Sequence, residues 1–255
     1  MAFAITLTNL EDAMERSGCP ICYLGKKVAK HNLESLLWEN VNDPATREAI
    51  NAALGFCPDH TQLLVMLEMS SSGPVLGVNL IFEHLARIAR DDLSSAKWQI
   101  DPVPFTTASI TSLITKKTRR GGAVLWKKQQ KCPVCKWVDQ ADLDFLAALF
   151  EDLNSDKSQL IQALMKSDGL CLKHLKLGLE NFTAEFPRAA EKLITDAINR
   201  LSIQSEQMKE YIRKCNWEYR AEKMTPEEAT AWKKTLVFFT GLSTSEFDFR
   251  SDKLV

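Results

Sequence analysis

Apolar side chains recur at intervals of three and four residues along most of the chain, which is the pattern of amphipathic helices. Between residues 20 and 39 the apolar positions include Leu24, Val28 and Leu33. A longer run with the same spacing begins at Pro187 and continues to about Arg220. No stretch alternates convincingly between apolar and polar residues, as a half-buried strand would. The sequence therefore predicts an all-α protein.

Capping residues predict where several helices begin and end. Asp43 followed by Pro44 is typical of a helix start, and the run Thr225–Glu228 is a capping box with proline at the first helical position. The final helix is expected to end at Gly241. Near the N-terminus, Thr8 to Glu11 has the same capping-box pattern and predicts a helix that begins there.

Breaks in this pattern suggest how the chain is divided. Serine, glycine and proline at residues 70–74 separate two helices, and residues 98–122 contain two prolines, several Ser and Thr residues and Gly121-Gly122. We interpret this second break as a linker or mobile excursion. The predicted regions are a first repeat over 1–97, the excursion over 98–122, a second repeat over 123–182 and a C-terminal helical region over 183–255 that packs on both repeats.

One combination of motifs occurs twice. Cys19-Pro20-Ile21-Cys22 is followed by Cys57-Pro58-Asp59-His60, and Cys132-Pro133-Val134-Cys135 is followed by Cys171-Leu172-Lys173-His174. A shift of 113 residues superimposes the two Cys-X-X-Cys pairs, and the following apolar positions also match. Such self-similarity indicates an internal duplication. The candidate metal ligands are Cys19, Cys22, Cys57, His60, Cys132, Cys135, Cys171 and His174.

Three cysteines and one histidine are the donor set of a closed tetrahedral zinc site. Each ligand pair stands at a predicted helix start, where the helix dipole stabilises thiolates. The similar intervals within each copy predict two helical hairpins, each closed at its base by one Cys3His site. Pairing of the first Cys-X-X-Cys with the second Cys-X-X-His is the alternative. The sequence thus predicts two Zn²⁺ per chain.

Other chemistry fits part of this pattern. An iron–sulfur cluster is the alternative cofactor, because three cysteines and a histidine can also ligate iron. Cys-Pro-X-Cys resembles redox dithiols, but the βαβ context of thioredoxin-like proteins is missing from the pattern. Four protein ligands fill a tetrahedral zinc ion and favour a structural role over catalysis. A redox or metal sensor remains open, since zinc thiolates release metal on oxidation.

Composition narrows the partners. The formal net charge of −1 gives no general reason to expect nucleic acid or an anionic membrane. The basic run Lys116–Arg120 is expected to be a solvated face, and nucleic-acid binding there is disfavoured. No window is apolar enough to span a membrane, and the N-terminus lacks the features of a signal peptide. With paired cysteines and no secretion signal, we expect a reducing, cytoplasmic location.

The remaining candidates add little chemistry. His31, His84 and Cys215 lie outside the duplicated motifs, and we find no phosphate-binding glycine loop and no nucleophile–base pair. An enzymatic site between the halves or near residues 98–122 is disfavoured for this reason. The sequence favours a non-enzymatic metal-binding scaffold or protein-interaction module, with a redox-responsive metal or iron–sulfur protein as the alternative. An unknown protein partner is compatible with either, and the oligomeric state cannot be read.

Several stretches together resemble an uncharacterised prokaryotic family, a domain of unknown function. They include the motif residues 19–22, 55–60 and 169–174, the segment 33–44, and Tyr211-Ile212-Arg213-Lys214 with Trp232 in the tail. The resemblance covers most of the chain. It implies that the duplicated Cys and His residues are the shared feature and that Cys215 is not part of it.

Overall fold

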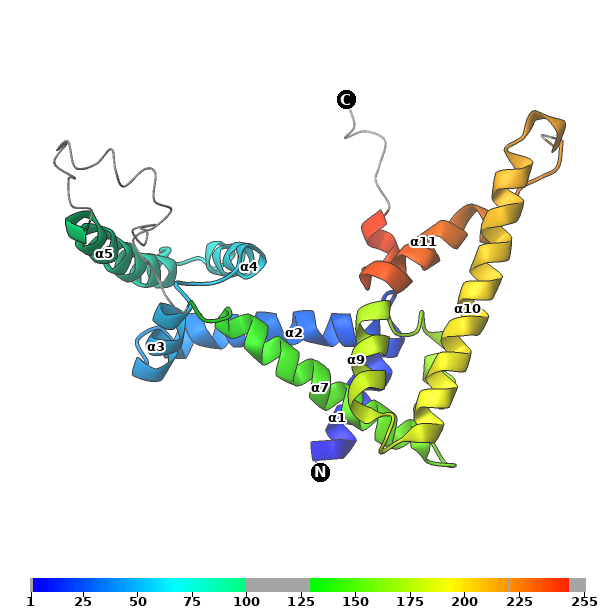
Figure 1. The fold of residues 1–255 in the computed structure, drawn as a ribbon, viewed down its shortest axis with the longest axis horizontal. Helices are drawn as coiled ribbons and strands as arrows, with labels where there is room; N and C mark the ends of the chain where they lie inside the picture. The colour runs from blue at the N-terminus through cyan, green and yellow to red at the C-terminus, as the bar shows by residue number, and fades with distance from the viewer. Residues whose placement is uncertain (1, 100–128, 220, 248–255) are drawn as a thin grey trace, which may run out of the picture. The chain divides into compact units, whose positions relative to one another are not determined.

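The computed structural model describes residues 2–99, 129–219 and 221–247, and its regular elements within these ranges are all helical. The all-α class predicted from the sequence is therefore confirmed for the described part of the chain (Figure 1). The α-helices are α1 (Ala2–Met14), α2 (Pro20–Ser35), α3 (Pro44–Ala52), α4 (Pro58–Met69), α5 (Leu76–Gln99), α7 (Pro133–Asn154), α8 (Ile161–Lys166), α9 (Leu172–Phe182), α10 (Pro187–Lys214) and α11 (Pro226–Thr240). The short elements are η1 (Leu36–Asn40, a π-helix), η2 (Trp217–Tyr219) and η3 (Thr244–Phe247).

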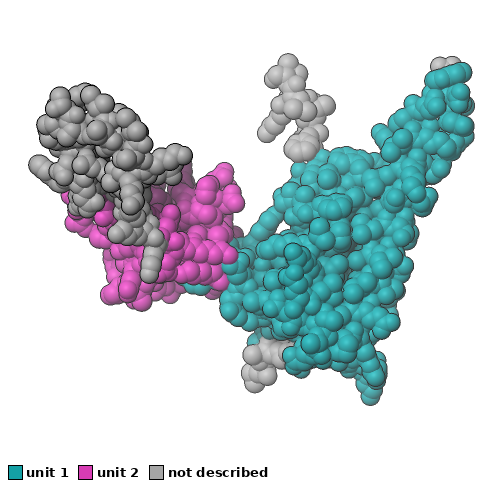
Figure 2. Space-filling view, viewed as in Figure 1, with its two compact units in different colours: residues 1–29, 137–255 teal, residues 30–136 magenta. Residues whose placement is uncertain are grey.

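The chain forms two compact units, coloured separately in Figure 2. Unit 1 contains residues 1–29 and 137–255, and unit 2 contains residues 30–136. Both boundaries fall inside helices, one in α2 and one in α7. The units thus differ in composition from the four consecutive regions expected from the sequence. The expected excursion at 98–122 lies almost wholly outside the described residues, and α5 continues to Gln99.

Unit 1 has an extensive hydrophobic core to which α1, α2, α7, α8, α9 and α10 all contribute. Phe150 of α7 is fully buried, and its ring centroid lies 5.6 Å from that of Phe182 in α9. Gly178 of α9 faces Phe150 so closely that a Cβ there would collide with the ring. Two of the candidate ligands, Cys19 and Cys171, are members of this core.

The C-terminal helices of unit 1 follow the predicted caps. α11 starts with a complete capping box between Thr225 and Glu228 and ends at Gly241 in the left-handed conformation, at φ +75°. α10 packs along α11 and α9. It begins at Pro187, as predicted, but ends at Lys214, about one and a half turns before the expected end. At this end Lys214 Nζ binds Glu228 at 2.7 Å and so joins the C-terminus of α10 to the start of α11.

Unit 2 packs α3, α4 and α5 with the end of α2. The Asp43 side chain caps α3 by accepting a 2.7 Å hydrogen bond from the Thr46 N–H, as the sequence predicted. Arg47 of α3 donates to the Leu80 carbonyl of α5 at 2.9 Å. The carboxylate of Glu68 accepts from two backbone N–H groups at the start of α5, Gly77 and Val78, and is itself buried. The buried apolar residues of this unit include Leu33, Leu36, Ile50, Leu64, Ile81 and Leu85.

One predicted helix start is wrong. α1 begins at Ala2 and runs through Thr8 without interruption. The Thr8 hydroxyl donates 3.1 Å back to the Ala4 carbonyl, four residues earlier, instead of capping a new helix. Threonine inside a helix commonly bonds in this way. In the part of the chain that the structure describes, no helix combines the length and the apolar character that crossing a membrane requires.

Candidate metal centres

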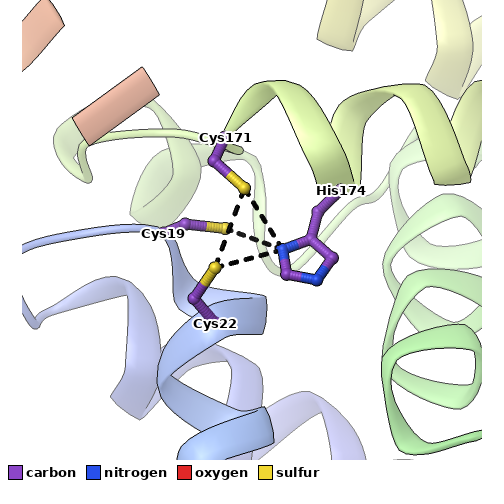
Figure 3. Close-up of side chains that lie close together, drawn as sticks. All are labelled: Cys19, Cys22, Cys171 and His174. Carbon is purple, nitrogen blue, oxygen red and sulfur yellow. Dashed lines mark hydrogen bonds between the residues drawn. The ribbon is translucent and has the colours of Figure 1, made fainter. Parts of the chain in front are cut away.

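The structure gathers Cys19, Cys22, Cys171 and His174 in unit 1, and we call this group the first centre (Figure 3). The three cysteine Sγ atoms lie 3.3–3.5 Å from Nδ1 of His174, and Cys22 Sγ lies 3.7 Å from Cys171 Sγ. Cys19, Cys171 and His174 are each only 1% exposed. The four side chains therefore point at one small volume inside the core of unit 1.

The second centre consists of Cys57, His60, Cys132 and Cys135, all in unit 2. Nδ1 of His60 lies 3.1, 3.7 and 3.4 Å from the Sγ atoms of Cys57, Cys132 and Cys135. Cys57 Sγ and Cys135 Sγ are 3.7 Å apart. Only Cys132 is buried here, and the other three are half-buried. All eight ligands predicted from the sequence thus fall into two Cys3His groups with similar internal distances.

The predicted pairing of these ligands is wrong. Each centre combines the Cys-X-X-Cys of one copy with the Cys-X-X-His of the other, so no hairpin is closed at its own base. Helix lengths explain this. From Cys22 the chain remains helical to Asn40, a rise of roughly 27 Å, whereas the returning α3 covers only about 13 Å. Arms of such unequal length cannot bring Cys57 back to Cys22.

The second copy has the same imbalance. α7 rises about 33 Å after Cys132, and α8 is a short helix of about 9 Å. Both long helices also change units: α2 begins at the first centre and ends among residues of unit 2, while α7 begins at the second centre and ends among residues of unit 1. The chain therefore visits both units within each copy, and the ligand pairs cross.

The predicted placement of ligands at helix starts is confirmed. Cys19 and Cys132 directly precede α2 and α7, and Cys57 and Cys171 are the N-cap residues of α4 and α9. The backbones of Cys57 and Cys171 are nearly identical, with φ/ψ of −68°/164° and −73°/163°. The positive ends of two helices thus meet at each centre. They favour thiolates and offset the net negative charge of three thiolates on a divalent ion.

A buried carboxylate supports the first centre, and the sequence analysis missed it. Oδ2 of Asp142 lies 2.9 Å from Nε2 of His174 and 3.1 Å from Nζ of Lys173. Asp142 is 1% exposed, and its second oxygen has no hydrogen-bond partner in the described structure. The contact leaves Nδ1 of His174 directed at the sulfurs. A sequence signal existed, because Asp142 stands seven residues after Cys135 on α7, two helical turns along the same face.

Gly241 covers the sulfurs of the first centre. A Cβ on this residue would overlap Cys22 Sγ and lie 3.3 Å from Cys171 Sγ. The segment that follows is fastened to the start of α2: the Cys19 N–H donates to the Gly241 carbonyl at 3.4 Å, and Lys26 binds Glu246 at 3.0 Å. The end of α11 is therefore part of the wall around this centre. The sequence analysis identified Gly241 only as a helix terminator.

The same packing sets the proton affinities that a metal ion must overcome. Hydrogen bonding to Cys171, with burial, raises the pKa of Cys22, while hydrogen bonds from Cys19 and Cys22 lower the pKa of Cys171. Burial opposes protonation of His174, but hydrogen bonds with Asp142 and the cysteines prevail and raise its pKa to about 11. Metal binding at the first centre therefore has to displace protons from Cys22 and His174.

The second centre has a different balance. Burial and the hydrogen bond with Cys57 raise the pKa of Cys135 to about 12. Burial lowers the pKa of His60, against the opposing charge of Asp59, so this imidazole favours its neutral, metal-binding form. At both centres four soft or borderline donors surround a single point, an arrangement that can bind one thiophilic cation and leaves no place in a tetrahedron for a substrate.

The other sequence candidates lie outside these centres. His84 bonds Asn51 at 3.2 Å between α5 and α3, and Cys215 is exposed at the end of α10. His31 belongs to neither ligand group. The basic run at residues 116–120 lies outside the described residues. Within the described structure, Cys and His side chains thus converge at these two places.

Comparison with known proteins agrees with the resemblance seen in the sequence. No curated protein and no solved structure matches the chain. The model of one family matches residues 1–244, nearly the whole chain, and this span includes both Cys3His groups. The chain therefore belongs to DUF6062, a family of unknown function.

Proposed function

We propose that the protein is a helical scaffold that binds two structural zinc ions, one at each centre. The distances between the ligand atoms support this proposal most directly. A tetrahedral zinc with Zn–S near 2.3 Å and Zn–N near 2.0–2.1 Å sets its sulfurs about 3.8 Å apart and sulfur from nitrogen about 3.5 Å apart. The corresponding distances are 3.7 Å for the sulfur pairs at both centres and 3.1–3.7 Å from sulfur to nitrogen.

These distances also favour a single ion over the alternative cofactor. In an iron–sulfur cluster the protein ligands bind different iron atoms, so at least some of them stand farther apart than the ligands of one ion. All donor atoms of each centre lie within 4.8 Å of one another. The redox-responsive iron–sulfur protein therefore ranks second to a protein with two mononuclear zinc sites.

A structural role fits the distribution of the ligands along the chain. The first centre joins residues up to 155 positions apart, and the second joins residues up to 78 positions apart. An ion at such a point cross-links segments that are free to separate in the unfolded chain, so its binding free energy adds to folding stability. All seven cysteines are free thiols, which is the form that metal binding needs. We propose a reducing, cytoplasmic environment for this reason.

Metal analysis of the full chain tests the proposal. Protein purified anaerobically should contain about two zinc ions per chain and show no visible charge-transfer absorption. Cys57→Ser and His174→Ala should each remove one zinc and lower the melting temperature, whereas Cys215→Ser should change neither. Stoichiometric iron with visible absorption would instead establish the iron–sulfur alternative, and protein with neither metal would refute metal binding altogether.

We also propose that this scaffold serves a protein partner. Support comes from large apolar side chains left in solvent: Trp38 is 78% exposed in unit 2 and Trp217 is 75% exposed in unit 1. Tryptophan is enriched among the residues that dominate binding energy at protein interfaces. Affinity capture with the wild-type chain, Trp38→Ser and Trp217→Ser tests this. A protein retained by the wild type and lost with one variant supports the proposal, and identical captured sets contradict it.

A further inference from the structure

The two centres share their donor set but differ in what surrounds it, and the difference bears on how each would hold a metal ion. At the first centre three of the four ligands are 1% exposed and two of them belong to the hydrophobic core of unit 1. At the second centre Cys57, His60 and Cys135 are half-buried. An incoming ligand must reach the ion before it can replace a thiolate, so the second centre is the more accessible to exchange.

The backbone cover shows the same contrast. Gly241 lies directly over Cys22 and Cys171 at the first centre, and the chain on either side of it is tied to the start of α2. In the described part of unit 2, the glycine nearest in sequence to the second centre, Gly55, faces Leu85 and Phe82 instead of a sulfur. The first centre therefore has a wall that must open before its ion can leave.

The support of the two histidines differs as well. Nε2 of His174 is held by the buried Asp142, while we find no partner for Nε2 of His60 among the described residues. Register explains the difference: the shift of 113 residues that superimposes the Cys-X-X-Cys pairs places Asp142 on Ala29. Loss of such an outer carboxylate typically weakens metal binding by about 10–100-fold.

The residue preceding each histidine completes the contrast. Lys173 at the first centre pairs with Asp142 and helps to balance the negative charge there. The matching residue at the second centre is Asp59, an exposed carboxylate that cannot form this ion pair. It adds negative charge beside an anionic site, which attracts cations from solution.

We propose that the second centre is an exchange site, which takes up and releases a thiophilic divalent cation such as Zn²⁺, while the first centre keeps its ion as a permanent part of the core. This inference rests on the proposed function, because it requires that both centres bind metal. It assigns the two copies of one motif to different tasks. The exposed copy responds to the availability of metal, and the buried copy maintains the fold of unit 1.

Release of zinc to a coloured chelator tests the inference. Full-length protein with about two zinc ions per chain is mixed anaerobically with excess 4-(2-pyridylazo)resorcinol, and the zinc complex is followed over time. We expect two phases of equal amplitude, one zinc in each, with rates at least about tenfold apart. Release of both ions in one phase would overturn the inference. A starting content below two would instead refute the proposed function, so the two failures are distinguishable.

Matched variants assign the phases. Cys135→Ser and Cys22→Ser alter the same motif position in the two copies. Cys135→Ser should remove the fast phase and keep the slow one, and Cys22→Ser should do the reverse. The opposite assignment would overturn the inference.

A milder pair of variants avoids dependence on folding of the cysteine mutants. Asp142→Asn should accelerate the slow phase by about 10–100-fold and leave the fast phase unchanged. Asp144→Asn, an exposed carboxylate on the same helix, is the control and should change neither phase. Circular dichroism confirms that both variants fold. A change confined to the fast phase, or no change with Asp142→Asn, would contradict the assignment of the protected centre.

Discussion

Replacing Gly241 with alanine tests how closely α11 and the first centre depend on each other. Gly241 has φ +75°, which L-residues rarely adopt, and its α-carbon faces two of the ligand sulfurs. Gly169 provides a matched control. Its φ is +78°, but a Cβ there would meet the flexible Arg200 side chain, with Nε at 3.1 Å. The two substitutions introduce the same backbone strain and differ in the neighbour that the new methyl group meets.

The expected costs follow from these two terms. A left-handed conformation costs a non-glycine residue roughly 1–2 kcal/mol, and both variants carry this term. Gly241→Ala also forces a methyl group against Cys22, and overpacking of this kind costs about 1–3 kcal/mol. We therefore expect a loss of about 2–5 kcal/mol for Gly241→Ala and about 1–2 kcal/mol for Gly169→Ala.

Thermal unfolding of the zinc-loaded variants measures the difference. For a folded unit of this size, 1 kcal/mol corresponds to about 2–4 °C, so Gly241→Ala should melt roughly 2–12 °C below Gly169→Ala. Zinc bound at the first centre should also reach the chelator faster in Gly241→Ala, because Cys22 or the end of α11 has to move. Equal melting temperatures together with equal release rates would refute the view that Gly241 covers the metal ligands.

Three further predictions concern the fold of unit 1. Phe150→Ala removes a fully buried ring that packs on Phe182 and should cost about 3–5 kcal/mol in denaturant unfolding, whereas a loss below 1 kcal/mol would contradict its place in the core. Thr225→Ala removes half of the capping box and should cost about 1 kcal/mol, measured in the same way, and an unchanged midpoint would show that the cap contributes nothing. The hydrogen bond from Lys214 lowers the pKa of Glu228, so this ion pair stabilises the protein above the usual glutamate pKa and is lost as the pH falls through the lowered value. Glu228→Gln preserves the capping pattern, and its acid unfolding should depend less steeply on pH than that of the wild type; an identical pH dependence would contradict the ion pair's role.

Local features of the fold could be predicted because they depend on neighbouring residues. The cap at Asp43, the capping box at Thr225 and the left-handed Gly241 each follow from the steric and hydrogen-bonding needs of a helix end. The exception, Thr8, shows the limit of such reasoning. Its sequence pattern is that of a cap, but helical residues on both sides let the hydroxyl bond within the helix.

The partners of the ligand pairs depend on distances that motif spacing does not express. Nearly equal intervals in the two copies suggested closure within each copy, yet equal intervals say nothing about how an interval divides between outward and returning helices. That division was available in the sequence, since the break at Asn42-Asp43 stands far closer to Cys57 than to Cys22 along a helical path. Asp142 was missed for another reason: a single acidic residue in an amphipathic helix has no distinguishing pattern until its histidine is placed beside it.

The crossed pairing nests one centre inside the other along the chain, and nesting favours an order of assembly. The sulfurs of Cys57 and Cys135 are 78 residues apart, and this interval lies within the 149 residues between Cys22 and Cys171. Once the second centre binds its ion, those 78 residues are bypassed and the outer loop shortens from 149 to about 71. Halving a loop lowers the entropic cost of closing it by about 0.6 kcal/mol, and synthesis also completes residue 135 before residue 171. The more open centre is therefore the one that forms first, and the first centre, with Gly241 from the end of α11 in its wall, can be finished only when nearly all of the chain is present.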